Sequence, residues 1–147
     1  MYSSLLHWIA LPETHNYLNT YKNSAARLVT LSKIRCHISP VLRDLHWLPI
    51  RSRIIYKILL ITFKCTRALA PIYLQDLIQQ YEPTRNLRSG SKYLLAHVSS
   101  PSTSYGRRSF QDASAELWNN LPYHVKSAKT LEQFKSLLKT YLFNVNV

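Results

Sequence analysis

Glycine is scarce in this chain, which contains only two among its 147 residues. Glycine provides the left-handed backbone of tight turns and lets phosphate-binding loops approach a ligand closely. Its shortage argues against a β-sandwich and against a Gly-rich nucleotide loop. Seven prolines are available instead to mark the ends of elements.

Acidic residues are scarce as well, with seven Asp and Glu against 19 Lys and Arg, which gives a formal net charge of +12. Such an excess repels itself unless an anionic partner is near. Nucleic acid is the first partner that this balance indicates and a membrane surface is the second. A simple contribution to solubility is the third interpretation.

Long apolar runs and paired cysteines are also missing. No uninterrupted apolar run is longer than Ile58 to Ile61, which is far shorter than the roughly 20 residues that span a bilayer. Met1 to Pro12 lacks the basic start of a secretory signal. Two cysteines, Cys36 and Cys65, make no disulfide framework and indicate reduced thiols. We therefore expect an intracellular protein, nuclear or cytoplasmic, with no membrane partner.

Apolar residues recur at helical spacing over much of the chain. The clearest helix is predicted over residues 51–69, where apolar residues on more than one face indicate a central position. Ser39 and Pro40 predict the start of a short helix, and Thr130 with Gln133 forms a T-x-x-Q capping box. The remaining helices are predicted over residues 18–31, 41–46, 72–81, 110–121 and from residue 130 onward.

These elements predict a mostly α-helical fold, a small helical bundle with one extended basic connector and room for one short strand pair near residues 92–98. The expected organisation is an N-terminal segment (residues 1–22), a helical subdomain (23–81), the basic connector (82–109) and a C-terminal helical segment (110–147).

Signatures of catalysis are absent from the sequence. The only close acidic pair, Asp112 and Glu116, stands at i, i+4 spacing typical of a solvated helix face. Cys36, His37 and His46 do not have the ligand spacing of a closed zinc site. There is no nucleophile elbow, P-loop or dinucleotide fingerprint. We expect no catalytic residue, metal, cofactor or small-molecule substrate.

Basic residues interleaved with aromatic ones are the remaining signal, because Lys and Arg neutralise phosphates while aromatic rings stack on unpaired bases. Within the predicted central helix, Arg53, Lys57 and Lys64 share one side. For Tyr81, Tyr93 and Tyr105, half-buried packing is an equal alternative, whereas Trp47 and Trp118 are expected to anchor the core. The predicted phosphate contacts are Arg51, Arg53, Lys57, Arg85, Arg88, Lys92, Arg107 and Arg108.

Five stretches are informative in their order and spacing. They are NSAARLV (residues 23–29), HISPVLRDLHWLPI (37–50), LAPIYLQDL (69–77), LWNNLP (117–122) and FKSLLKTYL (134–142). Together they resemble the C-terminal region of animal non-LTR retrotransposon reverse transcriptases, downstream of the polymerase palm.

The resemblance implies an origin in a polyprotein that nicks DNA and copies its own RNA at the nick. It also implies what this chain lacks, because the palm of these enzymes carries two adjacent aspartates and no two acids are adjacent here. We therefore expect a non-catalytic fragment that binds RNA or DNA with little regard to sequence, and that once packed on the missing palm domain.

Two other functions stay open at this point. The fragment could be a protein-interaction piece, or a relic without independent function, whose apolar helices expose surfaces that once met the palm. A helix-turn-helix DNA reader built on residues 39–69 is the weaker alternative, since its Trp47-Leu48-Pro49 turn lacks the usual glycine.

Overall fold

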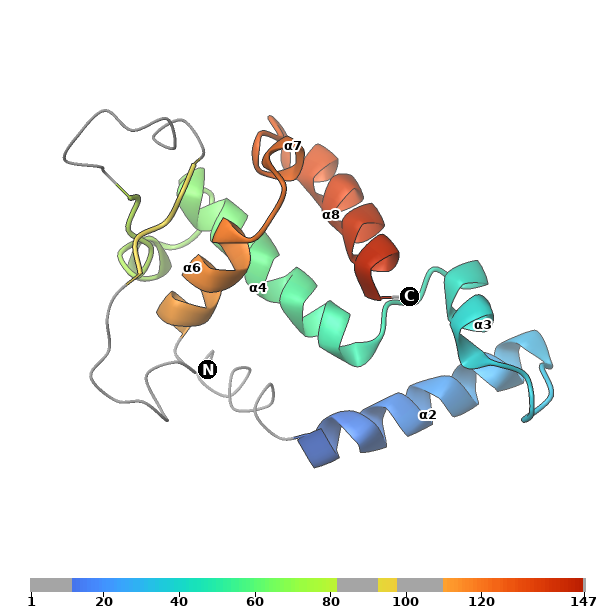
Figure 1. The fold of residues 1–147 in the computed structure, drawn as a ribbon. Helices are drawn as coiled ribbons and strands as arrows, with labels where there is room; N and C mark the ends of the chain where they lie inside the picture. Colours follow the sequence, from blue (N-terminus) through green and yellow to red (C-terminus); the bar gives the residue numbers. More distant parts are fainter. Residues whose placement is uncertain (1–11, 82–92, 98–109, 147) are drawn as a thin grey trace.

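The computed structural model describes residues 12–81, 93–97 and 110–146. Within these ranges the protein is mostly helical, as predicted, and its helices form a small bundle (Figure 1). The helices are α2 (Pro12–Thr30), α3 (Ile38–Asp44), α4 (Ile50–Thr66), α5 (Ile72–Gln75), α6 (Phe110–Asn119), α7 (Tyr123–Lys126) and α8 (Leu131–Asn146).

Helix α4 is the centre of the bundle, as its apolar residues on several faces predict. It packs against α6 on one side and α8 on another (Figure 1). The ring of Phe63 stacks on that of Phe134 with centroids 4.2 Å apart, and Trp118 lies within 6.5 Å of Phe63. These three rings belong to three helices, so the aromatic cluster fixes how α4, α6 and α8 pack. The burial of Trp118 confirms its predicted role in the core.

Helices α2 and α3 form a smaller unit beside the start of α4 (Figure 1). Ala26, Val41 and Leu42 make a second buried cluster, and Trp47 packs against it half-buried. The connection at residues 47–49 is non-helical, as predicted from the proline at its end. This connection carries the chain from α3 into α4 and places both next to α2.

Helix α8 begins with the predicted cap. The backbone N–H of Gln133 donates to Thr130 Oγ1 at 3.2 Å. The return bond is shifted by one residue, since Gln133 Oε1 accepts from the N–H of Lys129 rather than from that of Thr130. The structure therefore confirms the capping-box bond from Gln133 N–H to Thr130 Oγ1 but not the return bond to the N–H of Thr130.

Several predicted boundaries are wrong. The helix predicted over residues 72–81 ends at Gln75, because the backbone of residues 79–81 pairs with residues 94–96 instead. Helix α3 begins at Ile38, so Ser39 lies within it and does not cap it. Helix α2 spans Pro12–Thr30, so it begins six residues before the helix predicted over residues 18–31. Helix α7 was not predicted.

Residues 93–97 are held by long-range hydrogen bonds. Among the described residues, the only β-pairing is one antiparallel bridge between Gln80 and Leu95, which is what remains of the expected strand pair. The side chain of Asn119 brackets Leu95, accepting from its N–H at 2.9 Å and donating to its carbonyl at 3.0 Å. The segment is thereby fixed to the end of α6.

Candidate nucleic-acid interface

A groove of about 770 Å³ lies where α2, the α3–α4 connection, α4 and α8 meet. Its cationic lining residues come from three separate helices: Lys22 from α2, Arg53 and Lys57 from α4, and Lys139 from α8. We call it the basic groove. The other residues that line it are Ala25, His46, Trp47, Leu48, Ile50, Ile54 and Tyr56.

The local sequence of each element explains how these charges converge. Arg53 and Lys57 lie one helical turn apart on α4 and are both exposed. Lys22 reaches across from α2, where its Nζ donates to the carbonyl of Leu48 at 3.2 Å. His46 packs edge-on against Phe143 of α8, with ring centroids 6.3 Å apart. Contacts between α2, α4, α8 and the α3–α4 connection thus hold the cationic side chains around the groove.

The groove is short of negative charge. No acidic side chain is among the residues that line it in the described part of the chain. Lys22 is only 9% exposed, and its burial, followed by the charge of Arg53, lowers its pKa to about 8. An anion placed between these side chains would offset both effects.

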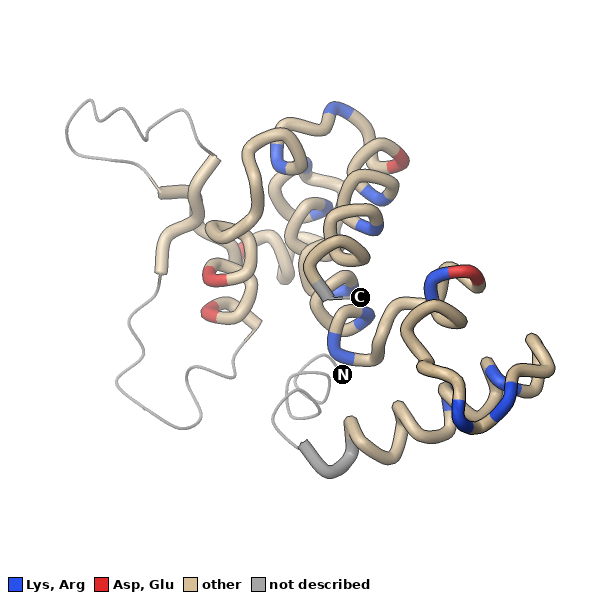
Figure 2. Tube along the Cα trace, turned by 45° about the vertical axis from the view of Figure 1, so that its right-hand side comes forward, with Lys and Arg blue, Asp and Glu red and all other residues tan. Residues whose placement is uncertain are grey.

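Charge is also separated at the scale of the fold (Figure 2). Basic residues mark α4 and α8, with the acidic Glu132 confined to the first turn of α8, whereas the acidic residues of α6 lie on another side of the bundle. The α4–α8 face therefore presents a positive field toward an approaching polyanion.

The structure brings only some of the predicted phosphate contacts together. Arg53 and Lys57 both line the basic groove, as their shared helix side predicts. Arg51 does not join them, because it lies on another side of α4 and lines a separate pocket of about 190 Å³ together with Glu116. The remaining five, Arg85, Arg88, Lys92, Arg107 and Arg108, lie outside the described residues.

Lys22, His46 and Lys139 line the groove but are not among the predicted phosphate contacts. Lys22 precedes the recognisable stretches, and Lys139 reads as an ordinary solvent-facing residue of an amphipathic helix. Lys22 and Lys139 reach the groove because α2 and α8 pack against α4, whereas His46 lies in the α3–α4 connection that borders it. The one signal in the sequence that points to His46 and Trp47 is their place in the stretch at residues 37–50.

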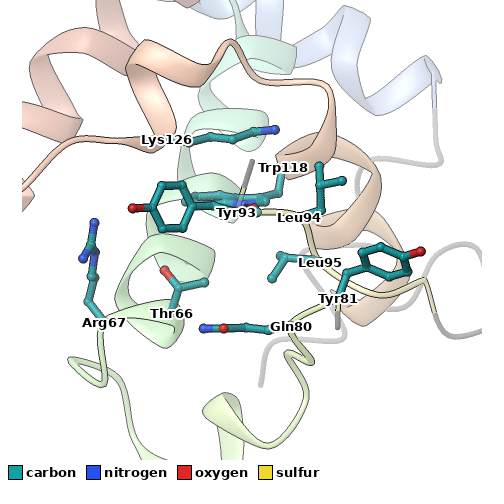
Figure 3. Close-up of a pocket in the computed structure, with 9 residues that line it drawn as sticks. All are labelled: Thr66, Arg67, Gln80, Tyr81, Tyr93, Leu94, Leu95, Trp118 and Lys126. Carbon is teal, nitrogen blue, oxygen red and sulfur yellow. Dashed lines mark hydrogen bonds between the residues drawn. The ribbon is translucent and has the colours of Figure 1, made fainter. Parts of the chain in front are cut away.

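A second pocket of about 320 Å³ lies at the C-terminal end of α4 (Figure 3). It contains the cations Arg67 and Lys126 and the aromatic residues Tyr81, Tyr93 and Trp118. We call it the tyrosine pocket. Thr66, Gln80, Leu94 and Leu95 complete its lining.

The aromatic residues of this pocket differ in exposure. Trp118 is buried and donates from Nε1 to the carbonyl of Tyr93 at 2.7 Å. Tyr81 is 43% exposed and Tyr93 is 55% exposed, so neither is a core residue, while Tyr105 lies outside the described residues. The rings of Tyr93 and Tyr123 stack with centroids 6.2 Å apart.

Metal-binding chemistry finds little support in the described ranges. No group of three His, Cys, Asp or Glu side chains there is arranged to hold a metal ion. Cys36 is exposed and Cys65 is buried, and neither is in a disulfide. Burial raises the pKa of the Cys65 thiol, so its environment is that of a core residue within α4.

Comparison with protein-family models, with curated proteins and with solved structures finds no match for this chain. The resemblance to reverse transcriptases therefore stays a prediction from the quoted stretches. Among the helices of the described residues, none has the length and apolar character needed to cross a bilayer.

Proposed function

We propose that this protein is a non-catalytic C-terminal region of a retrotransposon-derived reverse transcriptase, and that its basic groove holds the phosphates of RNA or DNA with little regard to sequence. The observation that carries the proposal is the groove itself. Four cations from three helices line it, with no acidic side chain among its described lining residues. Phosphate contacts of this kind give affinity without reading bases.

The stretches that carry the resemblance also build this groove. Residues 37–50 supply His46, Trp47, Leu48 and Ile50 to its wall, and residues 134–142 supply Lys139. The motif-bearing parts of the chain therefore form part of the groove's wall and supply Lys139, whereas Lys22, Arg53 and Lys57 lie outside them. This overlap is expected if the region supports a polymerase that handles nucleic acid.

The test is a comparison of two double variants with the same loss of charge. Arg53→Gln/Lys57→Gln removes two cations from the groove, whereas Lys33→Gln/Arg35→Gln removes two exposed cations outside its lining. Binding of a labelled single-stranded RNA and of a labelled DNA duplex is measured for both by fluorescence anisotropy.

We expect the groove variant to lose about tenfold or more in affinity, because each charged hydrogen bond contributes about 1.5–3 kcal/mol and about 1.4 kcal/mol is tenfold. The control variant should bind nearly as the wild type does. An unrelated sequence of equal length should bind equally well, since phosphates carry no sequence information. Equal losses of affinity in both variants would show that net charge alone attracts nucleic acid. That result would refute the proposed role of the basic groove.

A protein-interaction role is the second candidate, and exposed apolar residues on α2 favour it. Tyr17, Tyr21 and Leu28 share one side of α2 and are 68%, 73% and 76% exposed. Exposed apolar residues grouped on one side often mark a contact with another protein. If α2 docks on a partner or on a second copy, Tyr21→Glu/Leu28→Glu should abolish self-association or palm binding measured by light scattering while leaving RNA binding intact.

A further inference from the structure

The basic groove has an apolar and aromatic wall beside its cations. This wall is formed by Trp47, Leu48, Ile50, Ile54 and Tyr56. A duplex turns its phosphates outward and stacks its bases inside, so it offers such a wall little to bury. An unpaired strand offers a charged backbone together with the exposed faces of its bases. The lining of the groove therefore matches an unpaired strand better than a duplex.

The turn that ends α3 determines where Trp47 lies. The N–H of His46 donates to the Arg43 carbonyl at 2.9 Å. The N–H of Trp47 donates to the Leu42 carbonyl at 2.8 Å. These two bonds form a Schellman motif, and His46 occupies its left-handed position with a φ of 53°. The motif turns Trp47 back onto the helix, where it packs against the buried cluster that contains Val41 and Leu42.

Trp47 is consequently held on one side and accessible on another. It packs on the Val41 cluster, yet it is only half-buried and also lines the groove. Tyr56 lines the groove from α4 and packs against the larger core cluster. The groove therefore borders both cores. An aromatic ring that is already held in place loses little freedom when a ligand stacks on it.

Exposed cations flank this aromatic wall. Arg53 and Lys57 reach the groove from α4 and Lys139 reaches it from α8, and all three are exposed. The contact of His46 with Phe143 joins the α3–α4 connection to α8, the helix that carries Lys139. The volume of about 770 Å³ lies within the range of sites that enclose a small ligand, roughly 300–1,000 Å³. The groove thus has room for a base beside its phosphate.

We propose that the basic groove selects an unpaired RNA or DNA strand over a duplex, by stacking a base on Trp47 while the exposed cations hold the neighbouring phosphates. The inference rests on the proposed function and adds the form of nucleic acid that the groove takes. Stacking tolerates every base, because each base has a π-face. Selection of an unpaired strand is therefore compatible with binding that ignores sequence.

The first experiment measures the affinity of the full chain for an unpaired strand and for a duplex of equal length, by fluorescence anisotropy. At about 200 mM salt, where contacts to phosphates alone are weakened, we expect tighter binding of the unpaired strand. Trp47→Leu should weaken that binding about tenfold, which corresponds to about 1.4 kcal/mol and matches the loss of one stacked base. Its affinity for the duplex should stay near that of the wild type.

Two further variants separate stacking from packing. Trp47→Phe should restore the preference for the unpaired strand, since an aromatic ring remains. Val41→Ala is the matched control, because it loosens the same buried cluster but does not line the groove. It should keep the preference of the wild type. An RNA strand and a DNA strand of the same base sequence are both titrated, and the tighter of the two identifies the source.

A second measurement reports on Trp47 itself, because a base stacked on a tryptophan ring quenches its fluorescence. The chain contains three tryptophans, so the contribution of Trp47 is the difference between the wild type and Trp47→Phe. We expect a saturating unpaired strand to quench the wild type more strongly than Trp47→Phe, and a saturating duplex to quench both alike. This measurement decides the question without Trp47→Leu if circular dichroism shows that Trp47→Leu does not fold.

The proposal is overturned if Trp47→Leu or Val41→Ala weakens both forms of nucleic acid equally, or if the unpaired strand quenches Trp47→Phe as strongly as the wild type. Tighter binding of phosphatidylglycerol vesicles than of the unpaired strand would also overturn it, because the apolar wall would then hold acyl chains.

Failure of the proposed function is distinguishable from failure of this inference. If Arg53→Gln/Lys57→Gln binds both forms as the wild type does, the groove does not hold phosphates and both proposals fail. If that variant weakens binding of both forms while Trp47→Leu leaves the preference unchanged, only the selection by Trp47 fails.

Discussion

Lys22 is the residue whose charge conflicts most directly with its surroundings. Its side chain is almost fully buried between α2 and the start of α4, and burial, with the charge of Arg53 second, lowers its pKa to about 8. Its bond to the Leu48 carbonyl satisfies only one of its three N–H donors. Such a side chain is destabilising in the free protein but well placed to contact a bound phosphate.

The lowered pKa of Lys22 makes stability depend on pH. Below about pH 8 Lys22 is protonated in both the folded and the unfolded state, so the folded state bears the full cost of the buried charge. Between pH 8 and pH 10.5 the unfolded state still binds the proton while the folded state releases it, so the free energy of unfolding rises with pH.

We expect this rise in chemical denaturation experiments between about pH 7 and pH 9. Above that window it is offset, because the raised pKa values of Cys65 and Tyr56 act in the opposite direction. Lys22→Met should flatten the rise, and Lys57→Met, which removes an exposed lysine of the same groove, should not. A rise that persists in Lys22→Met would show that another group titrates.

Part of the candidate site can be predicted from single residues and their near neighbours. Arg53 and Lys57 are found because i, i+4 spacing on an apolar helix places them on one side. Arg51 lines a different pocket, since two residues along a helix amount to about 200° of rotation, and its contact with phosphate stays a prediction. Lys22 and Lys139 reach the groove only through tertiary packing, which no local pattern describes.

At the scale of elements, the core depends on contacts between α4 and α8. Phe134 is fully buried and its ring stacks on Phe63 at 4.2 Å. Phe134→Ala should lower the free energy of unfolding by about 3–5 kcal/mol, the range for removing a buried aromatic ring. Urea denaturation measures this directly. A loss below about 1 kcal/mol would show that α8 does not pack on α4 as described.

Asn119 is the link between α6 and the segment at residues 93–97. It brackets Leu95 with two hydrogen bonds, so Asn119→Leu should lower the free energy of unfolding by about 1–2 kcal/mol and speed hydrogen exchange at the Leu95 amide. Asn120→Leu is the matched control, because Asn120 is exposed and directly follows the same helix. Unchanged exchange at Leu95 in Asn119→Leu would contradict this role.

Elements with a strong local pattern are the ones that sequence reasoning finds. Helices α4, α6 and α8 follow from apolar periodicity and from caps, such as Thr130. The wrong extension of α5 has a long-range cause, since the N–H of Tyr81 donates to the Leu94 carbonyl and that of Ala96 to the Gln79 carbonyl. A partner that far along the chain overrides helix propensity and leaves no trace in the local sequence.

At the scale of the whole molecule, the packing of the helices determines where the net charge of +12 is concentrated. The basic groove takes cations from α2, α4 and α8, while α6 carries acidic residues on another side (Figure 2). The composition predicts an anionic partner, and the fold determines which surface meets it. We propose that this groove, rather than the net charge alone, binds nucleic acid.

The most direct test of that claim is the salt dependence of binding to a DNA duplex, measured between about 50 and 200 mM salt. Contact of the groove's four cations with about four phosphates predicts a log–log slope of about −3.6 for the wild type. In Arg53→Gln/Lys57→Gln two contacts are lost, so the slope should become shallower by about 2, whereas Lys33→Gln/Arg35→Gln should keep the wild-type slope. A flat response in the wild type, or the same change of slope in both variants, would contradict the claim.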